Sequence, residues 1–471
     1  MPLPCSRQLA MNEALARSPI SDTESCDEWT DVERWIWHRI ARGFVADVSL
    51  WRPDRDADVE PLQPCTVRPQ FLREILLEEP YRQQIPTNAI VIEGATFIDR
   101  LDWTGMTLTH GLALHRCVFE EEVCLMGMRS PRSLSFEGSA FRGPLVLSHA
   151  QVGGDLVLDG CRMTRPLAML AIRIDGTLSM RQGGQWAEIE FRESRIKQSL
   201  VVSDVHLLGA LTVHKLTIDG DAYMTRIEGL AGLTMCQTHI GGRLALTGCR
   251  MLGRIEFHGV DIGGSCLIRK GVECAAMTWR RTRIHGHLVL ASGTVVGCLD
   301  GTGLCIEGSV LCGAELRCQE FRLAWALVRG SVALWGTRIR AGANFRGMTV
   351  GERFSLGGHV QLESLDLSHA KIGADLIMMD VSIDTLVNMK GIEVDGALEL
   401  HAGSRFNDVI LSEGRYHGEV RIAGCCFQGA LRMEAIHIGG RLVIGDGAQL
   451  ACVTVTDGLS RHRHRQRRRD G

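Results

Sequence analysis

A period of eleven residues runs through most of this chain of 471 residues. Every eleventh position from Leu101 and Leu112 up to Val453 holds an apolar residue, without an insertion or deletion between them. A second apolar position follows two residues after each of these, as at Trp103, with Gly301 as the exception. A register kept for this long indicates a solenoid, in which each repeat packs only against its neighbours. We therefore expect one elongated unit instead of several globular domains.

Within each repeat, apolar residues stand at the first position and two, five and seven residues later. Residues two apart in an extended chain point to the same side, so this spacing predicts two short strands per repeat. Helical repeats do not fit this pattern, because their apolar residues would recur at spacings of three and four residues. Nine residues after the first position lies a glycine-rich corner, which suits positive φ or a close approach of two backbones. The glycines at this corner include Gly143, Gly154, Gly176, Gly209, Gly220, Gly242, Gly253, Gly264 and Gly286.

A longer period of 44 residues is superimposed on the first. At one apolar position a polar residue or glycine recurs every 44 residues, and the next residue is apolar instead. Such a one-residue shift is typical of a β-bulge. The spacing favours a four-sided parallel β-helix of about 22 residues per coil, with the bulges along one edge in alternate coils, although a 44-residue coil fits it too. The residues concerned are Gln185, Gly229, Glu273, Arg317, Gln361, Arg405 and Gln449.

This pattern resembles the pentapeptide-repeat proteins, whose right-handed, square β-helix also buries two side chains on each face. The resemblance covers residues 88–459, with faces of five and six residues instead of five and five. The chain is closer still to a group of bacterial solenoid proteins with units such as IGGRLALTGCRM (residues 240–251) and a helical N-terminal segment. Some of these carry the label membrane-associated oxidoreductase, so the resemblance implies an oxidoreductase as one alternative function.

The two ends of the chain differ from the repeats. We expect residues 1–26 to be disordered, residues 27–87 to form a helical cap, residues 88–459 to form the β-helix, and residues 460–471 to form a basic disordered tail. Thr30 and Glu33 form a capping-box pattern for a helix over residues 28–43, and a second helix is expected over residues 69–78. No comparable cap is visible at the C-terminal end. The last coil is therefore expected to be covered by a second copy or a partner, or to fray.

No motif of an active site, cofactor site or metal site is present: the chain has no G-x-G-x-x-G, P-loop, H-E-x-x-H, G-x-S-x-G or C-x-x-C. Several of the 17 cysteines share one repeat position and are expected to be small buried thiols, which suggests a reducing, cytoplasmic location. The bulge edge is the candidate interaction ridge, formed by Glu273, Arg317, Gln361 and Arg405. The candidate interaction tail consists of Arg461, Arg463, Arg465, Arg467, Arg468 and Arg469.

These features predict a non-enzymatic scaffold that binds another macromolecule, with a protein as the favoured partner. The formal net charge of −3 is too small for a mimic of nucleic acid. The Arg/His tail leaves contact with nucleic acid or an anionic membrane open, and a membrane-surface or host-delivered effector is the second alternative. A homodimer through the C-terminal coil is a further expectation, and no apolar run is long enough for a transmembrane helix.

Overall fold

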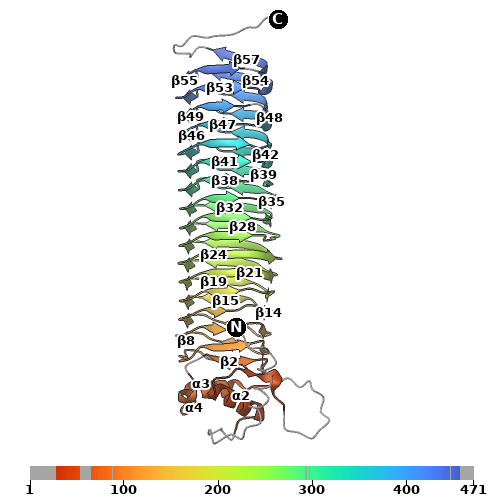
Figure 1. Cartoon of the computed structure of the whole chain (residues 1–471), viewed down its shortest axis with the longest axis vertical. Helices are drawn as coiled ribbons and strands as arrows, with labels where there is room; N and C mark the ends of the chain where they lie inside the picture. The colour runs from red at the N-terminus through yellow and green to blue at the C-terminus, as the bar shows by residue number, and fades with distance from the viewer. Residues whose placement is uncertain are drawn as a thin grey trace, which may run out of the picture.

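The computed structural model describes residues 28–52, 65–86, 89–291, 294–295, 297–313, 315–401, 403–445 and 447–456. These residues form a rod, a parallel β-solenoid of about 16 turns of about 22 residues each. The helices lie at the N-terminal end of the rod, and the strands stack from there towards the C-terminus (Figure 1). The expectations for residues 1–26 and for the tail 460–471 lie outside the described residues.

One coil shows how the four sides arise. Strand β13 (Leu156–Val157) lies on face 1, β14 (Arg162–Met163) on face 2, β15 (Leu167–Leu170) on face 3 and β16 (Arg173–Ile174) on face 4. Strand β17 (Leu178–Met180) then starts the next coil on face 1, where it pairs in parallel with β13. The partner of Leu156 is Leu178, 22 residues further along the chain. The 22-residue coil is thus confirmed, and the alternative of a 44-residue coil is wrong.

The core of the rod is built by the eleven-residue ladder. Leu156, Leu178, Leu244 and Leu398 each have 0% of their side-chain surface exposed. Because partners in a parallel ladder are equivalent positions of successive coils, like side chains stack in files along the axis. In one such file Phe119 packs against Phe97 and Phe141, with ring centroids 5.1 and 4.8 Å apart.

The two alternative roles expected for glycine, positive φ and close backbone approach, belong to different corners. At the glycine-rich corner, a Cβ on Gly143 would overlap the Glu121 carbonyl group of the previous coil, so glycine is needed there for close approach. The positive φ angles lie at a different corner, which recurs every eleven residues. It holds glycine in some coils and other residues in others, such as Arg116 with φ of 50° and His149 with φ of 61°.

The N-terminal cap contains the two expected helices, with slightly shorter bounds. They are α2 (Asp31–Ala41) and α3 (Pro69–Leu77), and a short helix α4 (Tyr81–Gln84) follows. The capping box of α2 is formed on both sides, since Thr30 Oγ1 accepts from the Glu33 amide and Glu33 accepts from the Thr30 amide. Strand β1 (Ala46–Asp47) of the cap pairs with β2 (Ile90–Glu93), so the cap also supplies a rung of the solenoid.

An ion pair between a buried carboxylate and a partly exposed guanidinium group joins the two main helices of the cap. Glu33 is fully buried, and its carboxylate accepts hydrogen bonds from Arg68 Nε at 3.0 Å and from the second guanidinium nitrogen at 2.7 Å. Burial by itself raises the pKa of the Glu33 carboxyl, but the hydrogen bonds from Arg68 and Thr30 outweigh it, so the pKa lies below its usual value. Trp29 and Trp37 are buried beside this pair, which identifies them as packing residues.

Replacing one ladder leucine by aspartate should destabilise the rod strongly. In Leu244→Asp the new carboxylate would be buried without a partner, and we expect a loss of about 4 kcal/mol or more. Chemical denaturation followed by circular dichroism measures the loss. The control is Thr234→Asp on β25 (Gly232–Cys236), where the side chain points outward. Equal midpoints for the two variants would contradict the register.

Acid should loosen the cap before the rod. Because the folded pKa of Glu33 is lowered, its stabilising contribution is complete above the unfolded value of about 4.3 and is lost as the pH falls through the folded value. The fluorescence of Trp29 and Trp37 should report this change below about pH 4. The variant Glu33→Gln should remove that step, and an unchanged acid transition in it would show that other groups control the cap.

Candidate functional site

The predicted bulge edge is present in the structure as one continuous ladder. Glu273, Arg317, Gln361 and Arg405 all belong to one ladder of paired backbone positions on face 2, separated by single intervening rungs. Successive members are therefore two strand spacings apart, about 10 Å. The intervening rungs carry Thr294, Arg338 and Ser382.

The pairing intervals explain the period of 44 residues. Thr294 pairs with Arg317, 23 residues later, and Arg317 pairs with Arg338, 21 residues later. The same alternation continues to Gln361 and beyond, so each long interval is compensated by a short one. The register shifts after this position, as between Cys318 and Glu320 of β39 (Arg317–Arg322), which is the expected bulge.

Part of the ridge borders a groove. A cavity of about 450 Å³ on the surface is lined by Arg317 and Gln361 together with Arg338 and Arg340. Glu363 and Asp384 also line it, so the groove carries both signs of charge. Glu273 and Arg405 share the ladder but do not line this groove. The structure thus brings two of the four ridge residues to one hollow and leaves the other two outside it.

A larger and more basic hollow lies on face 4, where the sequence had singled out no residue. This basic furrow has a volume of about 1080 Å³ and is lined by Arg129, Arg173, Arg195, Lys197 and Lys215, among others. It crosses β8 (Arg129–Ser130), β12 (Gln151–Val152), β16, β20 (Arg195–Ile196) and β23 (Thr217–Ile218). Aligning the chain at intervals of 22 would have revealed the column, because Arg129, Gln151, Arg173 and Arg195 are paired in succession.

Some of the basic side chains in the furrow are paired and others are not. Lys197 lies 2.8 Å from Asp175, Lys215 lies 2.9 Å from Glu193, and Arg195 lies 3.0 Å from Asp219. Arg129 and Arg173 make no ion pair with any carboxylate in the described part of the chain. The furrow therefore keeps a positive excess while acidic groups remain interspersed.

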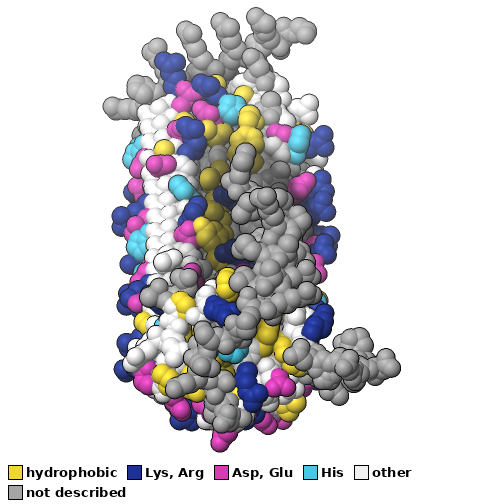
Figure 2. Space-filling model, turned by 60° about the horizontal axis from the view of Figure 1, so that its bottom comes forward, with side chains coloured by type: hydrophobic (Ala, Val, Ile, Leu, Met, Phe, Trp, Pro, Cys, Tyr) yellow, Lys and Arg dark blue, Asp and Glu magenta, His cyan; other side chains and the backbone are white. Residues whose placement is uncertain are grey.

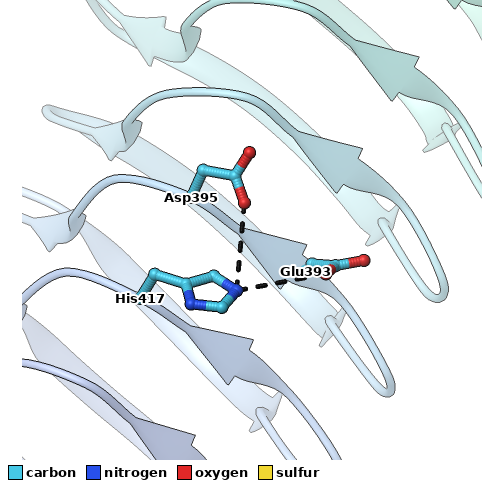
Figure 3. A group of neighbouring side chains, drawn as sticks. All are labelled: Glu393, Asp395 and His417. Atoms are coloured by element: carbon cyan, nitrogen blue, oxygen red, sulfur yellow. Dashed lines mark ion pairs between the residues drawn. The ribbon is translucent and has the colours of Figure 1, made fainter.

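A histidine near two carboxylates lies further along face 4. Glu393 begins β49 (Glu393–Val394), Asp395 follows this strand, and His417 follows β52 (Arg415–Tyr416) of the next coil. The imidazole points between the two carboxylates (Figure 3), and the donor atoms of the three residues all lie within 4.8 Å of one another. Within the described ranges it is the one group of three or more such side chains with this spacing.

Several cysteines that share one repeat position are buried in the core. Cys117 and Cys161 share one repeat position and are buried, and burial raises the pKa of both thiols to about 12. The Cys161 thiol donates to the Phe136 carbonyl oxygen at 3.0 Å, just as the Ser139 hydroxyl donates to Leu114 at 2.8 Å. These thiols are small and buried, as expected from the sequence, and in addition they donate hydrogen bonds to the preceding coil.

On the face of the rod shown in Figure 2, acidic and basic side chains alternate along the edges, and hydrophobic side chains lie between them.

None of the helices in the described part of the chain has the length and apolar character of a membrane span. The interaction tail from Arg461 to Arg469 lies outside the described residues. Comparison with family models, with curated proteins and with solved structures gave no match.

Proposed function

We propose that this protein is a non-enzymatic scaffold whose basic furrow binds an acidic, extended segment of a partner protein. The observation that carries the proposal is the furrow itself, a hollow of about 1080 Å³ with five basic side chains on a rigid sheet. The shape of the furrow and its charge both favour such a ligand.

The dimensions suit an extended peptide. The furrow spans six successive rungs from Thr107 to Thr217, or about 24 Å at 4.8 Å per rung. An extended segment rises about 3.3 Å per residue, so about seven residues fit along it. Pro131 and Gly153 line the hollow and bear no long side chain, which leaves the floor accessible between the charged residues.

The charges favour a protein over a nucleic acid. Arg129 and Arg173 lack a described carboxylate partner and can pair with acidic side chains of a ligand. Asp175 and Glu193 lie in the same lining and would repel a continuous row of phosphates. A protein segment can place basic or neutral residues opposite these two carboxylates, so a mixed-charge furrow selects for it.

Crosslinking inside cells tests the furrow. A photoreactive amino acid at Gln151, in the centre of the furrow, should give a protein adduct, and Arg129→Glu with Arg173→Glu should abolish it. The matched control pair is Arg280→Glu with Arg346→Glu, two exposed arginines away from the furrow, and it should leave the adduct unchanged. An adduct that nuclease removes, or one that survives the furrow variant, contradicts the proposal.

A flavin or nicotinamide absorbance in the purified chain would favour the oxidoreductase alternative instead.

A second candidate is self-association through the last coil. Val443, Ile444, Val453 and Val455 are 37, 43, 40 and 46% exposed there. Strand β57 (Gln449–Thr456) pairs with β54 (Cys426–Glu434) on one side, and no other described strand pairs with it. Antiparallel pairing of two such edges about a two-fold axis would cover the apolar side chains and close the assembly.

Light scattering on the purified full chain tests this second candidate. We expect a dimer for the wild type and a monomer for the double variant Val453→Glu and Val455→Glu, because the charges would be buried in the interface. The control Leu311→Glu changes a residue of similar exposure, 40%, in the middle of the rod and should remain dimeric. A wild-type chain that is monomeric at high concentration rules the dimer out.

A further inference from the structure

We propose that Glu393, Asp395 and His417 bind a divalent transition-metal ion of the zinc class on face 4. The register of the solenoid creates the site. Glu393 and Asp395 are two residues apart and project from the same side of the rod, while His417 is 22 residues after Asp395 and therefore lies one coil further on. An imidazole with two carboxylates is a donor set that Zn²⁺ and similar ions accept.

The distances fit a shared ion better than direct pairing. His417 Nε2 lies 4.0 Å from Glu393 Oε1 and 3.9 Å from Asp395 Oδ1, which is too long for hydrogen bonds. Ligands at about 2.0–2.2 Å from a common ion are about 3 to 4 Å from one another, so small side-chain rotations complete the site.

A second cluster on face 4, formed by His285, Asp261 and Glu307, has its imidazole nitrogens already paired with carboxylates. The ring nitrogens of His285 lie 3.1 Å from Asp261 Oδ1 and 3.2 Å from Glu307 Oε2, so both are already engaged with carboxylates. His417 has no such hydrogen bond with a described side chain, and its Nε2 faces both carboxylates at once (Figure 3). The two clusters have similar composition, but only the one at His417 leaves a nitrogen donor for an ion.

The surroundings orient one ligand and leave the site open. Lys371 Nζ lies 3.1 Å from Glu393 Oε2, which holds the carboxylate with Oε1 turned towards His417. In the column of Asp395 and His417, the neighbouring coils carry Gly373 before and Gly439 after. No side chain from these two positions covers the triad, so water or a ligand from a partner can fill the remaining coordination positions.

Cobalt(II) titration of the full chain tests the site. The background carries His462→Ala and His464→Ala, because these two tail histidines could bind the metal themselves. We expect one Co²⁺ to bind per chain. Its visible absorption bands should be those of an ion with nitrogen and oxygen ligands, without a thiolate charge-transfer band. His417→Ala and Asp395→Asn should each weaken binding by about 10-fold or more. Both positions are more than half exposed, so thermal unfolding should be unchanged.

The matched control is His437→Ala, which removes an exposed histidine of face 4 one coil beyond Arg415 and should bind Co²⁺ like the wild type. Binding that persists in His417→Ala, a thiolate band, or equal weakening in His437→Ala would mean an adventitious ion only and would overturn the proposal. A displacement series with Zn²⁺ on the same samples should reproduce the order of the variants.

Discussion

Parallel backbone pairing between residues 22 apart is the constraint on which the rest of this molecule depends. Each strand is too short to be stable alone, as two-residue elements such as β13 and β16 show, and it persists only because a coil lies on either side. The pairing turns a sequence interval into a distance: any two residues 22 apart are about 4.8 Å apart along the rod. The files of core side chains, the aligned corners and the columns of surface residues all arise because equivalent residues of successive coils lie directly above one another.

The same constraint limits how the chain can vary. An extra residue before face 2 would shift every later side chain from inside to outside unless it were removed again within the coil. The alternating intervals of 23 and 21 around Arg317 do this, because the insertion on one side of the strand is compensated on the other. Buried Leu362 and Phe406 show that the core remains filled after each shift. The bulge is thus a compensated irregularity that repeats with the coils.

The sequence predicts the architecture well because the core is periodic. The ladder through Leu156 and Leu178, the bulge edge at Arg317 and the capping box at Thr30 each have a local pattern that physical rules can interpret. The corner with positive φ was not predicted, although glycine recurs there, as at Gly105 and Gly127, because residues such as Arg116 occupy the same position in other coils. The basic furrow and the triad at His417 were missed because their members are one coil apart, and no short motif joins them.

In the basic furrow, binding of an acidic ligand would relieve repulsion between like-charged side chains of neighbouring strands. Arg173 and Arg195 are direct partners in the ladder of β16 and β20, and like charges in that position destabilise a sheet by a few tenths to about 1 kcal/mol. Asp219 neutralises Arg195 in part, whereas Arg173 makes no ion pair with a described carboxylate. An acidic group placed between the two guanidinium groups would replace repulsion by two charge-assisted hydrogen bonds. A ligand of opposite charge would therefore relieve a local repulsion between the two strands, which ties the charge pattern of the furrow to binding more closely than to the stability of the rod.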